Sequence, residues 1–389
     1  MNGSGHVVVA NIMPRSLLSS LKLARTPCEV HFFVALAGLY LGACAASKHA
    51  ATDAGTRDNS KADDAMGSGA RIYATVSGTS EVVVIDQNTF EQVGSIPVAA
   101  GPAIILQTPD GKKLYTANWQ GNSVSAIDTA TEDVVDIPTG GRPYVITMPP
   151  TGDFVYVGVN PTGIAVIDTK TDSIARTIPT SDLAASLIAS PDGKVLYIAT
   201  FSLTSTGQLR AISTADGAII HDPIAVGSAP AWITITPDGS HVYTLNFLSD
   251  DISVVDTDSF EVTATIATGT GSQAIIANVT PDGKTLWVTN HESAEAIAID
   301  TKTNEIVKTI PINGRPVGVQ FNADASQVYI TDFGPASLQA AADINYLLTG
   351  QFSSTDPGQI SVFNTKTGKQ IGDSLVLGPG PTSVVVGLN

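Results

Sequence analysis

The chain has 389 residues, of which 43% are hydrophobic, and its 36 acidic side chains outnumber 20 basic ones to give a formal charge of −16. An acidic surface repels phosphate backbones, and no basic stripe interleaved with aromatic residues appears, so the composition argues against nucleic-acid binding. Both cysteines, Cys28 and Cys44, lie near the N-terminus. The rest of the chain therefore has no disulfide, thiolate metal site, thiol nucleophile or Cys-x-x-Cys-His haem attachment.

The first 69 residues differ in composition from the rest of the chain. Three basic residues, Arg15, Lys22 and Arg25, precede an apolar stretch over residues 30–43. This stretch is too short to span a bilayer and has the length of a signal-peptide core. We therefore expect residues 1–43 to be a signal peptide.

The apolar stretch ends in Leu41-Gly42-Ala43-Cys44, which resembles the lipobox at which bacterial lipoproteins are cut and acylated. The resemblance implies that Cys44 carries a lipid; the alternative is an uncleaved anchor helix or a chance cysteine. The small, polar residues 45–69 bury too little apolar surface to fold. We expect residues 44–69 to be a lipid-attachment site and flexible linker, and the protein to be a membrane-anchored lipoprotein of the periplasm or cell surface.

A Pro-Asp-Gly turn recurs through the remaining chain. Its copies lie 41, 41, 46, 44 and 42 residues apart, a period typical of β-propeller blades. Six copies, two of them degenerate, are present: Thr108-Pro109-Asp110-Gly111, Pro150-Thr151-Gly152, Pro191-Asp192-Gly193, Pro237-Asp238-Gly239, Pro281-Asp282-Gly283 and Ala323-Asp324-Ala325.

A second marker, an apolar residue followed by Asp, Ser or Asn, recurs with about the same period as the turn. Between the markers lie short apolar runs rich in Val, Ile, Thr and Tyr, which are typical of antiparallel strands. The marker occurs seven times: Ile85-Asp86, Ile127-Asp128, Ile167-Asp168, Ile212-Ser213, Val255-Asp256, Ile299-Asp300 and Phe363-Asn364.

The two markers together predict seven units of four strands. The first unit begins at Arg71 with a second strand, and residues 381–386 look like a first strand. Pairing these ends within one blade closes the ring and removes open sheet edges. The sequence therefore predicts an all-β fold over residues 70–389: a seven-bladed β-propeller of four-stranded antiparallel blades, closed by pairing of the N- and C-terminal strands.

Four further tetrapeptides resemble the sequence that names the YVTN family of β-propellers, found in bacterial and archaeal surface and periplasmic proteins. They are Tyr115-Thr116-Ala117-Asn118, Tyr243-Thr244-Leu245-Asn246, Trp287-Val288-Thr289-Asn290 and Tyr329-Ile330-Thr331-Asp332. The terminal Asn is not general, because the runs that begin at Tyr73, Tyr156 and Tyr197 end in Val or Thr. The resemblance spans residues 71–389 and implies the fold and an extracytoplasmic setting, since the family is functionally heterogeneous.

The order of loops assigns different roles to the two faces of the ring. The first-to-second and third-to-fourth turns lie on one face, and they are the uniform Pro-Asp-Gly and Asp-Thr turns. Uniform turn residues serve the backbone, so we interpret this face as structural. The blade-to-blade connections and second-to-third loops differ from blade to blade, and we expect a specific site on that face.

Two arginines occupy equivalent positions on the predicted functional face. Arg142 and Arg315 each precede a proline, and paired guanidinium groups at the channel mouth would hold a carboxylate or phosphate. The alternative is that each arginine pairs with an acidic group of a neighbouring blade. Trp119, Tyr144 and Trp232 either wall such a pocket or pack between blades.

The same loops supply His291, Glu292 and Asp332 as further candidate ligand-binding residues. A carboxylate beside an imidazole orients it as a general base or keeps it charged, whereas a solvated loop pair does neither. The repeats offer no three-histidine metal set, and no loop has the dense acidic spacing of a calcium site. We predict no cofactor and no metal; calcium or a quinone cofactor remains open without support.

An insertion over residues 333–359 enlarges the second-to-third loop of the last blade. Pro335 suits the start of a helix, Leu338, Ala341, Ile344 and Leu348 recur at helical spacing, and Gly350 suits its end. We expect a helical insertion that covers the channel mouth or presents an apolar ridge to a partner; the alternative is that it packs on its own blade.

Three functional classes follow from this sequence. The favoured class is a membrane-tethered binding or scaffold module for a protein partner or small anionic ligand. The alternative is a propeller enzyme resembling lactonases, lyases or quinoprotein dehydrogenases, which requires His291, Glu292, Arg142 or Arg315 to converge. The third class is a structural envelope protein without a small-molecule site. No strong catalytic motif is present, so the enzyme class is not favoured.

Overall fold

The computed structural model describes residues 70–387, except residues 162, 181–183, 201–205 and 340–355. The chain divides into two units, Met1–Gly67 and Ser68–Asn389, and all the described residues belong to the second. The predicted signal peptide and the predicted linker with its lipid-attachment site at Cys44 lie outside the described residues.

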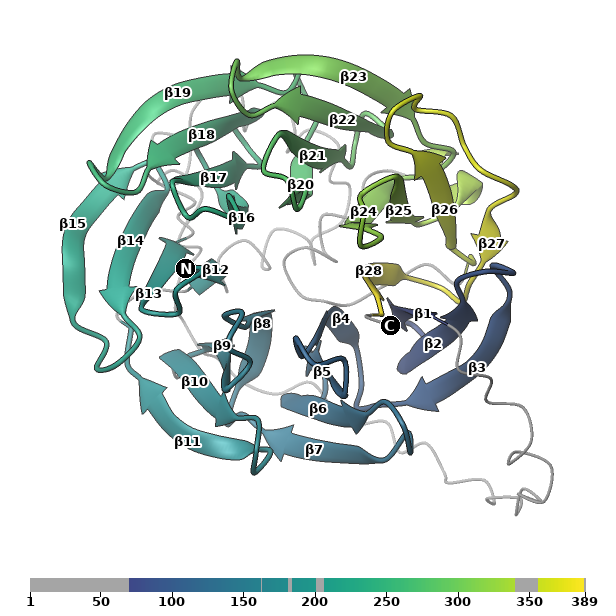
Figure 1. Cartoon of the computed structure of the whole chain (residues 1–389), viewed down its shortest axis with the longest axis horizontal. Helices are drawn as coiled ribbons and strands as arrows, with labels where there is room; N and C mark the ends of the chain where they lie inside the picture. Colours follow the sequence, from purple (N-terminus) through teal and green to yellow (C-terminus); the bar gives the residue numbers. More distant parts are fainter. Residues whose placement is uncertain (1–69, 162, 181–183, 201–205, 340–355, 388–389) are drawn as a thin grey trace, which may run out of the picture. The chain divides into compact units, whose positions relative to one another are not determined.

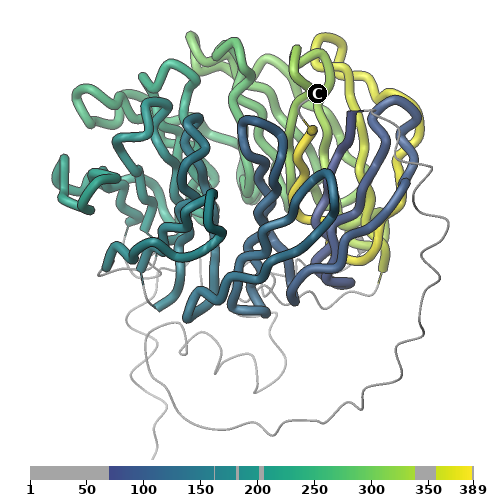
Figure 2. Tube along the Cα trace, turned by 60° about the horizontal axis from the view of Figure 1, so that its bottom comes forward, coloured from purple at the N-terminus to yellow at the C-terminus, as the bar shows by residue number. Residues whose placement is uncertain are grey.

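Seven four-stranded antiparallel sheets form a ring of blades, as the repeats predicted (Figure 1). Each blade has its first strand beside the central channel and its fourth strand at the rim, and Figure 2 shows the strands running between the two faces of the ring. Blade 1 consists of β28 (Pro381–Val386), β1 (Arg71–Val76), β2 (Glu81–Asp86) and β3 (Gln92–Pro97). Blade 2 consists of β4 (Pro102–Gln107), β5 (Lys113–Asn118), β6 (Ser123–Asp128) and β7 (Val134–Pro138). Blade 3 consists of β8 (Arg142–Thr147), β9 (Phe154–Asn160), β10 (Gly163–Asp168) and β11 (Ser173–Ile178).

The remaining four blades repeat this order. Blade 4 consists of β12 (Ala184–Ala189), β13 (Val195–Thr200), β14 (Gln208–Ser213) and β15 (Ile219–Ala225). Blade 5 consists of β16 (Pro230–Ile235), β17 (His241–Asn246), β18 (Asp251–Asp256) and β19 (Glu261–Ala267). Blade 6 consists of β20 (Ala274–Val279), β21 (Thr285–Asn290), β22 (Glu295–Asp300) and β23 (Glu305–Pro311). Blade 7 consists of β24 (Pro316–Phe321), β25 (Gln327–Asp332), β26 (Gln359–Asn364) and the short β27 (Leu375–Val376).

The two ends of the propeller meet in blade 1. β28 pairs antiparallel with β1, with Ile72 opposite Val386 and Ala74 opposite Val384. The hydroxyl groups of Thr75 and Thr382 lie 3.0 Å apart between these strands. The predicted closure is therefore present, and it leaves β1 with a neighbour on each side.

The core lies between the blades rather than inside one blade. The second and third strands are buried on both faces, as in β5 and β6, where small polar residues such as Thr116 and Ser125 are buried along with the apolar ones. The fourth strands are mostly exposed, as in β7 and β11. Each blade contributes apolar side chains to clusters that include residues of its neighbour, so stacking of adjacent sheets supplies the buried area.

One face carries the Pro-Asp-Gly and Asp-Thr turns, and we call it the turn face. Five of the third strands end in an aspartate that accepts backbone N–H groups of its own turn: Asp128, for example, accepts those of Ala130 and Thr131 at 2.8 and 3.0 Å. The threonine after this position donates to the carbonyl group that ends the Pro-Asp-Gly turn. This bond recurs as Thr129 to Gly111, Thr169 to Gly152, Thr214 to Gly193, Thr257 to Gly239, Thr301 to Gly283 and Thr365 to Ala325.

The glycines of the Pro-Asp-Gly turns have positive φ, and Gly152 is also closely packed against the neighbouring blade. Gly152 has a φ of 71°, and a Cβ atom there would lie 2.8 Å from Pro109 Cδ of the preceding blade. The degenerate turn of blade 7 places Ala325 at a φ of 52° instead. The repeated residues of the turn face are thus explained by backbone hydrogen bonds and blade contacts.

Candidate functional site

The blade-to-blade connections and second-to-third loops share the opposite face, which we call the variable face. Four candidate residues lie there at the boundary between blades 6 and 7. His291 and Glu292 follow β21, Arg315 immediately precedes β24, and Asp332 ends β25. These four residues and their neighbours form what we call the Arg315 cluster.

An ion pair between the two blades is at the centre of this cluster. Arg315 Nη2 lies 3.2 Å from Glu292 Oε1, and the side chains are 8% and 36% exposed, respectively. Arg315 Nε and Glu292 Oε2 are buried and have no hydrogen-bond partner among the described residues. Arg315 therefore pairs with an acidic group of the neighbouring blade, and each partner keeps one polar atom that this pairing does not satisfy.

His291 lies against the same segment as Glu292. Its side chain is buried, and Nδ1 donates to the carbonyl oxygen of Pro316 at 3.1 Å. The imidazole packs edge-on against the ring of Phe333, with centroids 5.4 Å apart. His291 and Glu292 thus contact the consecutive residues Pro316 and Arg315, because they lie in a turn and not in a strand with alternating side chains.

Asp332 is the most deeply buried acid of the cluster. It is fully buried, and its carboxylate accepts the N–H of Gly334 at 2.7 Å and Nε2 of Gln359 at 3.2 Å. Burial raises the pKa of Asp332 to about 7, although both hydrogen bonds act in the opposite direction. Gln359 Nε2 also lies 3.2 Å from the carbonyl oxygen of Asn313, so this side chain links β26 to the connection that enters blade 7.

In blades 2, 5 and 6, the position equivalent to Asp332 is an asparagine that donates to the first residue of the third strand. Asn246 Nδ2 donates to Asp251 at 2.6 Å, and Asn290 Nδ2 donates to Glu295 at 3.1 Å. Blade 7 reverses the two roles, because the acid is on the second strand and the amide on the third. The asparagine of the YVTN-like tetrapeptide is therefore a strand-to-strand connector, and blade 7 keeps the connection with exchanged chemistry.

The insertion of blade 7 begins at this cluster. A 3₁₀ helix spans Pro335–Gln339, and Ser337 Oγ accepts the N–H of Arg315 at 3.0 Å while it donates to the carbonyl of Gly334 at 2.6 Å. The predicted helical start at Pro335 is present as 3₁₀ helix. Residues 340–355, which contain the rest of the predicted helix, lie outside the described residues.

A second group of candidate residues lies between blades 2 and 3. Trp119 and Tyr144 pack edge to face with centroids 4.6 Å apart, and Trp119 is 8% exposed. Their contact is the inter-blade packing that the alternative interpretation expected. Arg142 begins β8 beside them and is exposed, in contrast to the buried Arg315.

The two arginines are not paired with each other. β8 and β24 are separated by the first strands β28 and β4 on one side and by β12, β16 and β20 on the other (Figure 1). Arg142 and Arg315 therefore lie on opposite sides of the channel, and a small anion does not reach both guanidinium groups. Sequence equivalence placed them at the same height in different blades, but only the ring order sets the distance between blades.

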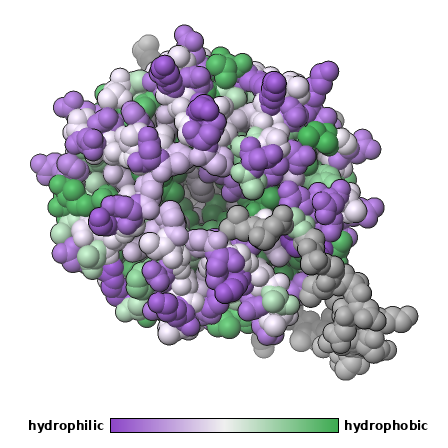
Figure 3. Space-filling model, in the orientation of Figure 1, coloured by the Kyte–Doolittle hydropathy of each residue, from purple (hydrophilic) through white to green (hydrophobic). Residues whose placement is uncertain are grey.

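Trp232 lies in the channel wall. Its side chain on β16 is partly buried and packs against three of the buried clusters, which reach from blade 3 to blade 7. Its Nε1 donates to the carbonyl oxygen of Ala277 on β20 at 2.9 Å. The channel opening is visible as a hollow ringed by hydrophilic residues in Figure 3. Trp232 thus links inner strands, which is a packing role.

Two residues of the Arg315 cluster were not anticipated. Gln359 is the last residue of the insertion and Ser337 lies near its start, so neither belongs to a recurring motif. Strand register was the signal that could have identified Gln359. Asp332 is opposite Gln359 in β25 and β26, just as Asn246 is opposite Asp251 in β17 and β18. Three of the four residues named for an enzyme, His291, Glu292 and Arg315, lie together, whereas Arg142 does not.

The described part of the chain contains no group of three or more His, Cys, Asp or Glu side chains arranged to hold a metal ion. In the same residues, no helix has the length and apolar character needed to cross a membrane.

Comparisons with known proteins agree with the architecture. A family described as YNCE-like β-propeller matches residues 223–332. A seven-bladed β-propeller protein, Rv1057 of Mycobacterium tuberculosis, is 32% identical over 148 residues, which are 36% of this chain and 37% of the relative. The chain is a β-propeller repeat protein.

Two other curated relatives match longer parts of the propeller. Antigen Lp49 of Leptospira interrogans is 26% identical over 49% of this chain and 46% of its own length. The uncharacterized protein YwhL of Bacillus subtilis is 30% identical over 52% of this chain and 45% of its own length. The chain spans less than half the length of the curated relatives it matches.

Solved structures of differently named proteins share the fold. A functionally unknown protein from Desulfotomaculum acetoxidans has a TM-score of 0.65 at 16% identity and covers 82% of this chain and 99% of its own. Hydrazine synthase of Kuenenia stuttgartiensis has a TM-score of 0.54 at 19% identity, and the match covers 72% of this chain and 96% of the hydrazine synthase chain. The dihydro-haem d1 dehydrogenase NirN has a TM-score of 0.56 at 16% identity, and the match covers 81% of this chain and 74% of NirN. These likenesses concern the fold alone.

Proposed function

We propose that this propeller is a membrane-tethered, extracytoplasmic binding or scaffold module whose variable face holds a protein partner or a small anionic ligand at the Arg315 cluster. The observation that carries the proposal is the buried Arg315, whose Nε has no partner among the described residues. Buried polar groups are rarely left unsatisfied, and sites that lack a partner within the chain are places where a ligand group gains affinity.

The contrast between the two faces supports this placement. On the turn face, the residues that recur in each repeat form hydrogen bonds that also recur from blade to blade, such as Thr169 to Gly152 and Thr257 to Gly239. On the variable face, Arg315, His291 and Glu292 have no counterpart with the same chemistry in every blade. Residues outside the repeat pattern are available for one specific contact.

A binding role suits the cluster better than proton transfer. Glu292 is neutralised by Arg315, and His291 is oriented by the Pro316 carbonyl and the Phe333 ring. The charged groups are thus paired with each other or with the backbone. An arginine held in this way offers a fixed donor to a carboxylate or phosphate.

The test is a thermal-shift titration of the full chain with citrate and inorganic phosphate. A ligand at 100 times its Kd stabilises by about 2.7 kcal/mol, which gives a shift of a few degrees. We expect stabilisation that Arg315→Met abolishes and that the matched Arg142→Met variant, which changes an exposed arginine at the equivalent position, retains. Equal behaviour of the two variants would remove the cluster from the proposal.

The tether is tested separately through Cys44. We propose that this residue carries the lipid, and Cys44→Ser is expected to move the protein from the membrane fraction to the soluble fraction of the cells that express it. A variant that stays with the membrane to the same extent as the parent would refute lipid attachment at this residue.

A further inference from the structure

The seams between blades on the turn face follow one rule. Each third-to-fourth turn contains a residue with positive φ, and at three seams this residue contacts the aromatic side chain on the second strand of the preceding blade. Between blades 2 and 3, the residue is Asp172, with a φ of 48°, and the aromatic residue is Tyr115. The same juxtaposition places Phe260 beside Tyr197 and Phe90 beside Tyr329.

At the seam between blades 2 and 3, which we call the occupied seam, the carboxylate of Asp172 is held by side chains of the preceding blade. Tyr115 Oη donates to Asp172 Oδ1 at 2.6 Å, and Lys113 Nζ lies 2.6 Å from Asp172 Oδ2. Lys113 Nζ also donates to the carbonyl of Thr169 at 2.8 Å. A ring donor and a lysine that is anchored on a turn carbonyl thus hold one carboxylate.

The seam between blades 6 and 7, which we call the vacant seam, has the donors without the carboxylate. Trp287 takes the place of Tyr115, and Gly368, with a φ of 70°, takes the place of Asp172. The lysine comes from the fourth strand: Lys308 Nζ donates to the carbonyls of Thr365 and Lys366 at 2.7 and 2.6 Å. Thr365 is the equivalent of Thr169, so the lysine is anchored in the same way.

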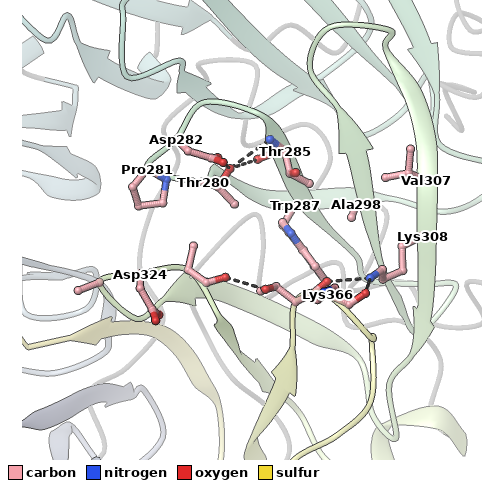
Figure 4. A pocket seen from close by; sticks show the side chains of 13 residues that line it. Thr280, Pro281, Asp282, Thr285, Trp287, Ala298, Val307, Lys308, Asp324 and Lys366 are labelled. Carbon is pink, nitrogen blue, oxygen red and sulfur yellow. Dashed lines mark hydrogen bonds between the residues drawn. The ribbon is translucent and has the colours of Figure 1, made fainter.

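Small residues leave a groove at the vacant seam. Thr285 stands where the occupied seam has Lys113, and Ala298 adds little volume to the lining. Gly368 lies beside this lining, since a Cβ atom there would be 3.1 Å from Lys308 Cδ. The groove has a volume of about 550 Å³, within the range of small-molecule sites. Figure 4 shows Trp287 of β21 and Lys308 of β23 in its lining, both from blade 6.

Trp287 is the donor that the groove leaves unused. Its side chain is 1% exposed, no hydrogen bond within the described residues involves Nε1, and Nε1 is not among the fully buried atoms that lack a partner. In Figure 4 the indole nitrogen faces the groove. Nε1 is therefore open to the groove that Trp287 lines, and it is a position for an acceptor from outside the chain.

We propose that the vacant seam is a second binding site, which takes the carboxylate group of a monocarboxylate between Trp287 Nε1 and Lys308 Nζ, in the place that Asp172 occupies in the occupied seam. This site is on the turn face and is independent of the Arg315 cluster. It is an exception to the structural role of that face.

The lining restricts the ligand class. Asp282 and Asp324 border the groove; Asp282 is paired with Lys284 at 3.1 Å, and Asp324 accepts the hydroxyl of Ser326 at 2.6 Å. Their negative charge disfavours a second anionic group on the ligand. Pro281, Ala298 and Val307 line the rest with apolar surface. The site therefore fits one carboxylate attached to an apolar body.

The test follows the indole N–H resonances of the three tryptophans in the ¹⁵N-labelled full chain. Trp287→Phe assigns the Trp287 signal. Titration with benzoate is expected to shift this signal saturably, and the uncharged benzamide is expected to leave it in place. A shift confined to Trp119 or Trp232, or an equal response to benzamide, would overturn the proposal.

Two variants and a matched control test the geometry. Gly368→Asp restores the protein's own carboxylate and is expected to abolish the benzoate shift, since Asp172 shows that aspartate adopts this backbone conformation. Lys308→Met is expected to weaken benzoate binding at least tenfold. Arg176→Met is the control, because Arg176 is the equivalent fourth-strand residue and donates to Thr214 at another seam. Undiminished binding by Lys308→Met, or an equal loss in the control, would refute the site.

A peptide arm distinguishes two sources of the same group. A short peptide that ends in phenylalanine with a free carboxylate represents the C-terminus of a partner, and its amidated form is the control. A response to the free-acid peptide at tenfold lower concentration than benzoate would assign the site to a protein terminus; the reverse order would assign it to a free organic acid.

Discussion

Asp332 and Gln359 face each other across β25 and β26 with the acid and amide exchanged relative to the neighbouring blades. Asp332 Oδ2 accepts Gln359 Nε2 at 3.2 Å, whereas in blade 5 Asn246 Nδ2 donates to Asp251 at 2.6 Å. The exchange puts the carboxylate on the buried strand end, where Asp332 is 0% exposed. One pair thus explains both the aspartate in the last YVTN-like tetrapeptide and its raised pKa.

The first prediction concerns the pH dependence of stability. The pKa of Asp332 is raised from 3.8 to about 7 by burial, so between these values the native state holds a proton that the unfolded state has lost. This contribution therefore lowers the free energy of unfolding as pH rises, by at most about 1.4 kcal/mol per pH unit, and is constant above pH 7. Urea unfolding should show Asp332→Asn gaining stability relative to the parent from pH 4.5 to pH 8.

The difference between these two proteins is the informative quantity, because other titrating groups contribute equally to both. Asparagine keeps an acceptor for Gly334 and adds a donor for which Gln359 presents its amide oxygen after rotation. A stability difference that stays constant between pH 4.5 and pH 8 would contradict a raised pKa for Asp332.

The second prediction concerns the ion pair of Arg315 and Glu292. Glu292→Gln leaves a guanidinium that is 8% exposed without a countercharge and is expected to cost about 2–4 kcal/mol. Arg315→Met leaves a carboxylate that is 36% exposed and is expected to cost about 1 kcal/mol. The double variant should resemble Arg315→Met, because the unpaired buried charge is then absent.

Chemical denaturation of the four proteins gives the coupling between these two residues. Arg142→Met controls for loss of a positive charge in an acidic chain and should stay within about 0.5 kcal/mol of the parent. The account of this pair fails if Arg315→Met is more destabilising than Glu292→Gln.

The third prediction concerns the repeated turn-face hydrogen bond. Thr301 Oγ1 donates to the carbonyl of Gly283 at 2.6 Å, and Thr301→Val removes this donor with little change in volume. We expect a loss of about 1 kcal/mol in the free energy of unfolding. Thr177→Val, at an exposed position of β11, is the control and should be neutral. Equal effects of the two variants would show that the hydrogen bond contributes nothing.

The fourth prediction concerns closure of the ring. Removal of residues 381–389 deletes β28, exposes the edge of β1 and uncovers apolar side chains of the cluster that includes Ile72 and Val384. We expect loss of the cooperative thermal transition and aggregation. Thr382→Val removes one 3.0 Å contact with Thr75 and is expected to cost about 1 kcal/mol while the transition remains. A truncated protein that melts like the parent would show that closure is dispensable.

The architecture was predictable because each repeat carries its own local chemistry. Asp128 holds its turn through bonds to residues two and three positions away, and Gly152 takes a conformation that disfavours other residues. Such short-range requirements recur from blade to blade and can be recognised in the sequence. The closure by residues 381–386 was also legible, because one strand pattern was missing at the beginning and present at the end.

The candidate site was only partly predictable, because contacts between blades depend on ring order. Sequence equivalence suggested that Arg142 and Arg315 act together, but their blades lie across the channel, and Arg315 instead meets Glu292 of the adjacent blade. Gln359 lies beyond a long insertion from Asp332, and its role is set by strand register. The vacancy at Gly368 has meaning only beside Trp287 and Lys308, which lie some 60 to 80 residues earlier in the chain.

The sequence by itself determined the seven blades, the loops of each face and the closing strand, since turns and strands follow from residues close together in the chain. The tertiary structure alone decided which side chains meet: it buried Arg315 and exposed Arg142, raised the pKa of Asp332 and opened the groove at Trp287. The physical reason is that burial, desolvation and the distances between blades are properties of the packed ring, and each depends on residues from more than one repeat.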